Sequence, residues 1–305
     1  MKSTLKNLLS CSKVILQTQF SIFSVLLFSN KIGIRKIQSF SKRAIILGNG
    51  PSLANDKENI EEIKSQNSTD LWAVNFFANS DFFQTIKPTH YVVADPIFWR
   101  KDLNESQKTL LCKLLYNLNS KTDWRLILAI PYEAKNSFFI SQISNKTISI
   151  IYYNRTPATG LSYVTRLLYD LQLAIVPAYN VLIATLTLAI PLKYEEIYIF
   201  GADHSWHEEL RVTNNNETHV EQIHFYDKKS KPEPVHKDHS TTFDIGELFI
   251  RWGNVFKQYH TIAQYAQLHD VAIFNASSKT YIDAFERIPH DFISKKAAEP
   301  SITQK

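Results

Sequence analysis

Short apolar runs alternate with longer amphipathic stretches from residue 44 to residue 274. Strands of a parallel sheet are buried on both faces and read as apolar runs, whereas the helices that cover the sheet read as amphipathic stretches. The sequence therefore predicts an α/β, Rossmann-like fold with a mostly parallel sheet, helices on both faces and a lid segment. We expect strands at residues 44–47, 71–74, 91–94, 125–129, 148–152, 196–200 and 271–274, and helices at 57–66, 105–116, 160–173, 180–189 and 245–269.

Three parts of the chain differ in composition: an amphipathic and basic N-terminal segment (1–42), one large domain (43–290) and a flexible tail (291–305). The chain has 305 residues, of which 44% are hydrophobic, so it has enough apolar side chains for a sizeable core. Residues 207–242 are polar and lack a clear period. A stretch of this length inside a compact domain is usually a lid over a site or a disordered excursion.

The formal net charge of +5 comes without a dense basic run or a nucleic-acid motif, so we expect no nucleic-acid partner. This charge is compatible with anionic substrates or an anionic membrane surface. The two cysteines, Cys11 and Cys112, form neither a disulfide framework nor a cysteine zinc site. We therefore expect a reducing, cytoplasmic location.

Residues 14–28 are apolar but are interrupted by polar side chains, and lysines and arginines flank them on both sides. This run is too polar for a typical transmembrane helix, and it lacks the small-residue cleavage site of a signal peptide. A helix that lies on the inner membrane, with its basic flanks on anionic lipid, would give a peripheral membrane contact through residues 14–43. The alternative is a helix that packs on the protein's own domain.

A glycine-containing turn, Gly48-Asn49-Gly50-Pro51-Ser52, follows the first predicted strand. A helix is expected to begin near Leu53, and a strand, glycine turn and helix in this order can present backbone N–H groups to a phosphate. A side chain at either glycine would hold the anion away from the backbone. The alternative is an ordinary strand-to-helix turn. Because Leu53 stands where the dinucleotide fingerprint has its third glycine, the turn argues against a nicotinamide or flavin dehydrogenase.

Five predicted strands are followed by an amide or a carboxylate. Ligands of α/β sheets bind beyond the carboxyl ends of the strands, so these side chains predict a polar ligand cleft. As an alternative, asparagine and aspartate are common helix caps and turn residues. The five residues are Asn49, Asn75, Asp95, Asp203 and Asn275.

Six histidines fall between residues 203 and 240, in and next to the predicted lid. A zinc site is conceivable, but their spacing matches no familiar ligand pattern. A lid histidine that acts as a general base is the simpler interpretation, because imidazole titrates near neutral pH. Most of the histidines are expected to be surface residues without a role.

Four segments resemble one superfamily, over residues 43–288: Gly48-Asn49-Gly50-Pro51-Ser52, Val74-Asn75, Gly201-Ala202-Asp203 and Asn275-Ala276-Ser277-Ser278. This superfamily contains the bacterial sialyltransferases of glycosyltransferase family 42 and the domain family named after the archaeal 6-hydroxymethylpterin diphosphokinase. The last segment is more similar to the diphosphokinase-named family, which includes many bacterial proteins of surface-polysaccharide synthesis. The resemblance implies a nucleotide-dependent transferase, most simply a glycosyltransferase with a nucleotide-sugar donor and a glycan acceptor.

The same resemblance implies roles for single residues. Asn49 and Asn75 would contact the nucleotide, and Asn180 would meet the donor from the start of a helix. A lid histidine, for which His239 is the candidate, would deprotonate the acceptor hydroxyl, and Asp203 would shape the floor of the site. The predicted catalytic residues are thus His239 and Asp203, and the predicted donor-binding residues are Gly48, Asn49, Gly50, Pro51, Ser52, Asn75, Asp95, Asn180 and Gly201.

Two departures from the sialyltransferase pattern leave other functions open. Asp95 stands where those enzymes have an asparagine, and Ser205 and Trp206 stand where they have tyrosines. Asp95 and Asp203 could instead hold Mg²⁺ beside a di- or triphosphate, as a pterin-type diphosphokinase that uses ATP would require. No cofactor is expected for the glycosyltransferase. A non-catalytic protein that binds nucleotide or glycan is the third alternative.

Overall fold

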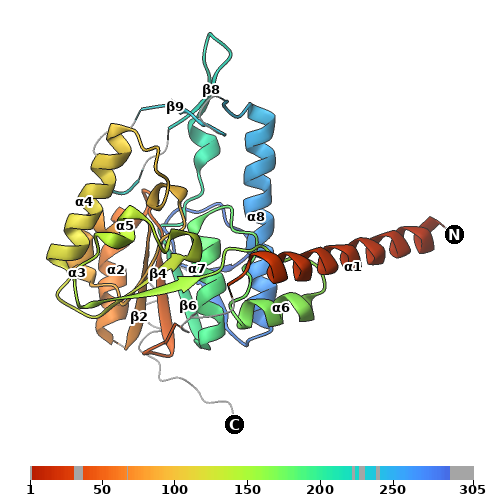
Figure 1. Ribbon diagram of the computed structural model, residues 1–305, viewed down its shortest axis with the longest axis horizontal. Helices are drawn as coiled ribbons and strands as arrows, with labels where there is room; N and C mark the ends of the chain where they lie inside the picture. Colours follow the sequence, from red (N-terminus) through yellow and green to blue (C-terminus); the bar gives the residue numbers. More distant parts are fainter. Residues whose placement is uncertain are drawn as a thin grey trace.

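A parallel sheet of eight strands forms the centre of the computed structural model, which describes residues 2–30, 37–66, 68–221, 224–226, 231–237 and 241–288 (Figure 1). The strands lie in the order β11-β10-β6-β1-β2-β3-β4-β5, and every neighbouring pair is parallel. Their bounds are β1 Arg43–Leu47, β2 Thr69–Val74, β3 His90–Val92, β4 Leu126–Pro131, β5 Ile148–Tyr153, β6 Glu196–Phe200, β10 Ala272–Asn275 and β11 Glu286–Arg287. The predicted α/β fold is confirmed, and each of the seven predicted strands is present. The prediction missed β11, whose two residues are too few to give a pattern.

Eight helices are described: α1 Lys2–Phe28, α2 Leu53–Gln66, α3 Phe82–Ile86, α4 Glu105–Lys121, α5 Phe138–Ser141, α6 Ser162–Asp170, α7 Val181–Ala189 and α8 Ile245–Gln267. The five helices predicted within the domain are present with shifted ends. The short helices α3 and α5 were not predicted, because one turn of helix has no measurable period.

Two apolar cores lie on opposite faces of the sheet, and β1 contributes to both. Ala44 and Ile46 point into the core beneath α7 and α8, whereas Ile45 and Leu47 point into the core beneath α2, α3 and α4. This is the alternation expected of a strand whose successive side chains face opposite sides. Both faces are therefore covered by helices, as the sequence predicts.

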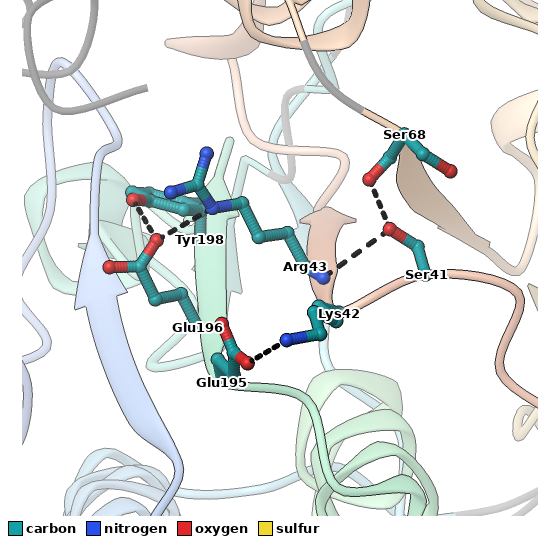
Figure 2. Close-up of polar contacts among 7 residues, drawn as sticks. All are labelled: Ser41, Lys42, Arg43, Ser68, Glu195, Glu196 and Tyr198. Carbon is teal, nitrogen blue, oxygen red and sulfur yellow. Dashed lines mark hydrogen bonds and ion pairs between the residues drawn. The ribbon is translucent and has the colours of Figure 1, made fainter. Parts of the chain in front are cut away.

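A nearly buried ion pair fixes the amino end of β1 to β6 (Figure 2). The guanidinium Nε of Arg43 lies 3.0 Å from Oε2 of Glu196, and the hydroxyl of Tyr198 donates to the same carboxylate at 2.8 Å. Burial and the neighbouring Glu196 raise the pKa of Tyr198, so its hydroxyl stays protonated and continues to donate. Arg43 therefore cannot contact lipid, although its position in the sequence places it in the basic flank that follows residues 14–28.

Polar contacts also surround the residues just before β1. Lys42 pairs with Glu195 at 2.7 Å, and the hydroxyl of Ser41 donates to the carbonyl of Ser68 (Figure 2). These contacts join β1 to both of its neighbours, because Glu195 precedes β6 and Ser68 precedes β2. The Lys42–Glu195 pair is exposed, so it contributes little to stability.

Helix α1 extends away from the rest of the molecule and meets it only near its carboxyl end (Figure 1). The side chains that it turns toward the domain include three hydroxyls, those of Thr18, Ser21 and Ser24, together with Val25. Ser21 donates to the carbonyl of Thr159 at 2.8 Å and accepts from its N–H at 2.9 Å. The second half of α1 thus packs on the domain, as the alternative interpretation of the sequence predicts.

A small antiparallel sheet lies within the predicted lid, at the end of the molecule where the central strands finish (Figure 1). It consists of β7 Leu210–Val212, β8 Thr218–Val220 and β9 Glu233–Pro234. The N–H of Phe225 donates to the carbonyl of Asn49 at 3.1 Å, so this segment is attached to the turn after β1.

Candidate functional site

The chain changes direction across the sheet between β1 and β6. The strands that follow β1 add on one side of it up to β5, and the chain then returns to place β6 on the other side. Connections that leave neighbouring strands in opposite directions open a crevice at the carboxyl end of a sheet, where ligands of such folds bind. A cavity of about 480 Å³ lies there, lined by the turns after β1 and β6 and by residues of the lid. We call it the first cavity.

The two turns that form the floor of the first cavity touch each other through their backbones. The amides of Gly48 and Gly50 donate to the carbonyls of Phe200 and Gly201, each at 2.8 Å. A Cβ at Gly48 would stand 2.3 Å from the Gly201 oxygen, and a Cβ at Gly50 would stand 2.0 Å from Oδ1 of Asp203. The glycines are therefore required for the close approach of the two turns. The sequence predicts that these glycines leave space for an anion. In this structure the space is filled by the turn after β6.

Asp203 occupies the amino end of α2. Its Oδ1 accepts from the hydroxyl of Ser52 at 2.6 Å, and its Oδ2 accepts from the Ser52 amide at 3.0 Å. Burial raises the pKa of Asp203, although these two hydrogen bonds oppose the shift. A negative charge beside a helix N-terminus is favourable. The sequence predicts that a bound phosphate provides this charge, whereas in the structure the carboxylate of Asp203 provides it.

Three asparagines line the first cavity from three different elements: Asn49 after β1, Asn75 after β2 and Asn180 before α7. Each amide also has a structural contact. Asn49 donates to the Val74 carbonyl at 3.3 Å, and Asn75 accepts from the Ala94 amide at 3.1 Å. Asn49 and Asn75 are therefore turn residues that keep amide atoms available to a ligand. The amide of the helix cap Asn180 is instead engaged by Ile183, His204 and Tyr259.

The side-chain oxygen of Asn49 is buried and accepts no hydrogen bond from any residue that the structure describes. Because the amide nitrogen is the atom that faces the Val74 carbonyl, the oxygen must be the atom without a partner. An unsatisfied buried acceptor costs about 1–3 kcal/mol. A ligand that offers an N–H or O–H group to Asn49 would remove this cost.

His204 lines the first cavity and was missing from the predicted site. It is buried with a backbone φ of 53°, and its Nε2 lies 2.7 Å from the hydroxyl of Tyr259 and 3.0 Å from Nδ2 of Asn180. Oδ1 of Asn180 accepts from the Ile183 amide, so Nδ2 is the donor toward the imidazole. With donors around Nε2, the proton of the neutral ring resides on Nδ1.

Burial lowers the pKa of His204 to about 3, so this histidine is neutral at physiological pH. Its Nδ1–H can donate a hydrogen bond, whereas a general base would need a pKa nearer 7. The sequence carries one signal for it, since it directly follows the Gly201-Ala202-Asp203 turn. No pattern could have identified Tyr259, which lies in the middle of α8.

The charge around the first cavity is mostly negative. Its lining includes Asp203, Glu208, Glu209 and Glu221, against the single ammonium of Lys279. Hydrogen bonds from Lys279 and from Tyr281 lower the pKa of Glu208, so that side chain is ionised. A ligand in this cavity thus meets amide groups and neutral donors next to a carboxylate-rich rim.

A second cavity, of about 500 Å³, adjoins the first and shares four lining residues with it: Asn75, Asn180, Val181 and Trp206. Asp95 lines the second cavity and not the first, and its carboxylate caps a short helix by accepting from the Ile97 amide at 2.9 Å. The structure therefore does not place Asp95 and Asp203 in one cavity.

Most of the predicted site residues meet at the first cavity. These are Gly48, Asn49, Gly50, Pro51, Ser52, Asn75, Asn180, Gly201 and Asp203. Asn275 is fully buried, and its Nδ2 donates to the hydroxyl of Thr280 in the turn that follows. This is the structural role that was the alternative for the asparagines after the strands. His239 lies outside the residues that the structure describes. His224 lines the first cavity, contrary to its expected place among the surface histidines.

No protein-family model matches the sequence, and no curated protein matches it. Among solved structures, the chain is similar to the MAf glycosyltransferase from Magnetospirillum magneticum AMB-1, with a TM-score of 0.47 and 13% sequence identity. The superposition covers 94% of this chain and 41% of that protein, so this chain spans less than half of its length. The resemblance to the diphosphokinase-named family stays a prediction.

Proposed function

We propose that the protein is a nucleotide-dependent transferase, and specifically a glycosyltransferase that binds a nucleotide-sugar donor in the first cavity. The observation that carries the proposal is the convergence of Asn49, Asn75 and Asn180 on one cavity at the crevice between β1 and β6. Amides offer both a donor and an acceptor, which suits the edges of a base and the hydroxyls of a ribose. The resemblance in sequence supports the same chemistry and a role in bacterial surface-glycan synthesis.

Each residue of the first cavity has a distinct task in this proposal. The unpaired oxygen of Asn49 accepts from the base or ribose, and neutral His204 donates from Nδ1 to an oxygen of the ligand. Asp203 fixes the turn that carries Asn49 and does not transfer a proton itself, because Ser52 occupies both of its oxygens. His239 remains the proposed general base for the acceptor hydroxyl.

The diphosphokinase alternative requires Mg²⁺ beside the phosphates, with Asp95 and Asp203 as its proposed ligands. These two carboxylates line different cavities, and within the described parts of the chain no three His, Cys, Asp or Glu side chains are grouped to hold a metal ion. The separation of Asp95 and Asp203 is the observation that favours the glycosyltransferase. Release of AMP from ATP in the presence of a hydroxymethylpterin and Mg²⁺, without sugar transfer, would reverse this preference.

Calorimetric titration with a panel of nucleoside mono- and diphosphates and nucleotide sugars tests the donor site. We expect Asn49→Ala to weaken the preferred nucleotide by about tenfold, since one hydrogen bond of this kind contributes roughly 1–1.5 kcal/mol. Asn214→Ala, in the exposed hairpin between β7 and β8, is the matched control and should bind as the wild type does. Equal affinities for the wild type and Asn49→Ala would contradict the assigned role.

We also propose that the protein sits peripherally on the cytoplasmic face of a membrane through α1. Within the described residues, one stretch, Cys11–Phe28, is long and apolar enough to cross a bilayer by length and composition. Its hydroxyl-bearing face is buried against the domain, whereas its large apolar side chains are exposed. The exposed side chains include Ile15, Leu16, Phe20, Phe23, Leu26, Leu27 and Phe28.

This arrangement is the reverse of a helix that covers the core of a water-soluble domain, which buries its apolar face. A surface that exposes so many large apolar groups marks a contact with lipid or with another protein. The neighbouring segment adds exposed Leu161, Tyr163, Leu167 and Leu171, and Lys13 provides a positive charge on the helix. Hydrogen bonds join Thr18, Ser21 and Ser29 to the domain, so the apolar part of α1 would lie in the interface and not cross the bilayer.

Co-sedimentation with vesicles tests the membrane contact. The double variant Phe20→Gln and Phe23→Gln should lose roughly 100-fold in vesicle affinity, because burying each ring contributes about 1.5 kcal/mol. Phe138→Gln, at an exposed phenylalanine on α5, should bind vesicles as the wild type does. If light scattering instead shows a dimer that the double variant disrupts, while vesicle binding is unchanged, a second copy of the chain covers α1.

A further inference from the structure

We propose that the second cavity binds an anionic sugar, so that the acceptor carries a carboxylate or a phosphate. The inference rests on the proposed function, because it places an acceptor beside the donor of the first cavity. The two cavities differ in charge. The first is rimmed by four carboxylates, whereas the second is lined by Arg155, Lys237 and Arg251 against Asp95 alone.

Two of these cations have no carboxylate partner in the part of the chain that the structure describes. Lys237 pairs with Glu247, but neither Arg155 nor Arg251 forms an ion pair there. Each guanidinium instead lies over an aromatic ring, Arg155 at 5.0 Å from the centre of Trp99 and Arg251 at 5.3 Å from that of Phe243. Stacking of this kind holds the plane of the guanidinium and leaves the N–H groups at its edge available.

A planar fork of N–H groups fits the two oxygens of a carboxylate or phosphate, and such charge-assisted bonds are stronger than neutral ones. The arginines come from separate elements, since Arg155 follows β5 and Arg251 lies on α8. They thus meet at the second cavity from two different parts of the chain. An unpaired cation that is held in position by a ring is well suited to bind an anion.

The rest of the lining suits a sugar ring. Trp252 lines the cavity and stacks on Trp206, with ring centres 6.2 Å apart and planes inclined by 26°. The flat face of an indole matches the C–H face of a pyranose. Asn75, Asn180 and Trp206 border both cavities, so a sugar in the second would lie next to a donor in the first, as transfer requires.

The charge preference can be measured with three sugars that differ at one position: glucose, glucose 6-phosphate and glucuronic acid. Titrations followed by ligand-observed NMR, with the preferred nucleotide present, should show tighter binding of both anionic sugars than of glucose. The double variant Arg155→Gln and Arg251→Gln should weaken the anionic sugars by at least tenfold and leave glucose unchanged. The affinities for glucose 6-phosphate and for glucuronic acid, compared with each other, show whether the arginines prefer a phosphate or a carboxylate.

The control is Arg125→Gln. This arginine also lies over an aromatic ring, at 4.7 Å from the centre of Phe40, but it precedes β4 and so lies at the amino end of the strands, away from the cavities at their carboxyl end. It should bind all three sugars as the wild type does. Binding of glucose as tight as that of the anionic sugars, or no binding of any of the three, would overturn the proposal.

The same titrations separate this inference from the proposed donor site. If the arginine variant lowers the affinity for the nucleotide but not for the sugars, the second cavity receives the donor's phosphates and the anionic acceptor is wrong. If Asn49→Ala leaves nucleotide affinity intact, the donor assignment fails whatever the sugars do.

Discussion

Arg43 stands at the amino end of the central strand, and its guanidinium is almost completely enclosed. Its side chain is 10% exposed and that of Glu196 is 16% exposed, whereas the adjacent pair of Lys42 and Glu195 is 68% and 44% exposed. Removal of one partner of an enclosed pair leaves an uncompensated charge, whereas an exposed pair is screened by water. Two neighbouring ion pairs at the start of β1 should therefore contribute very differently to stability.

Arg43→Met is expected to lower the free energy of unfolding by about 3 kcal/mol, because it leaves the Glu196 carboxylate buried without its cation. Lys42→Met should change it by less than about 0.5 kcal/mol. Urea denaturation of both variants measures the difference. Equal losses for the two variants would show that burial of the Arg43 pair is unimportant.

His204 should make stability depend on pH. Burial lowers its pKa to about 3, while an exposed histidine of the unfolded chain has a pKa near 6.5. Between these values the unfolded state binds one more proton, so the contribution is complete above pH 6.5 and is lost as the pH falls. From pH 7 to pH 5 the loss is about 2 kcal/mol.

Denaturation of the wild type and of His204→Gln at both pH values isolates this contribution, because all other titrating groups are common to the two proteins. The wild type should lose about 2 kcal/mol more than the variant on acidification. Parallel pH profiles would mean that His204 is not buried as a neutral ring.

At the scale of elements, the contact between α1 and the domain depends on Gly160. Its φ is 127°, and a Cβ there would stand 2.2 Å from the Thr18 hydroxyl and 2.7 Å from the backbone nitrogen of the same residue. The backbone atoms cannot yield as a flexible side chain would. The position of the helix is therefore set by the absence of a side chain on the loop that precedes α6.

Gly160→Ala should displace α1 at a cost of about 1–3 kcal/mol in local strain. Amide hydrogen exchange in residues 18–28 should become faster, while exchange in the central strands stays unchanged. Gly253→Ala is the control: among the described residues, no atom outside the adjoining helix backbone lies within 4 Å of its Cβ position in α8, so it should be neutral or stabilising. Unchanged exchange in α1 of Gly160→Ala would contradict this packing.

The regular elements were predictable because β-strands and long helices leave a periodic record in the sequence. Strand β6 and the start of α8 were predicted to the residue, since apolar runs and a helix cap mark them. The antiparallel sheet inside the lid was not predicted, because β7, β8 and β9 have only two or three residues each, too few to give a pattern. Tertiary contact, and not local propensity, creates such strands.

At the scale of the whole molecule, the order of the strands explains which site residues the sequence could reveal. Residues in the turns that follow the strands, such as Asn49, Asn75 and Asp203, were identified from the rule that ligands bind at the carboxyl ends of parallel strands. From α8, Tyr259 contacts His204 and Arg251 lines the second cavity, and nothing in the chain near them records which strand end they approach. The same rule identified Asp95 as a residue near the ligand, but its side chain lines the second cavity and not the first. The rule does not say which of two adjoining cavities a strand end faces.

The lid segment is a single excursion between β6 and α8, and both of its ends are fixed. It leaves the sheet at the turn held by Asp203, and it returns at Asp244, whose carboxylate and backbone form a reciprocal cap with Glu247. Much of the second cavity's wall comes from this segment and from the first turns of α8. Substitutions confined to this one interval would therefore reshape the second cavity and leave the strands, the glycine turn after β1 and its Asn49 as they are.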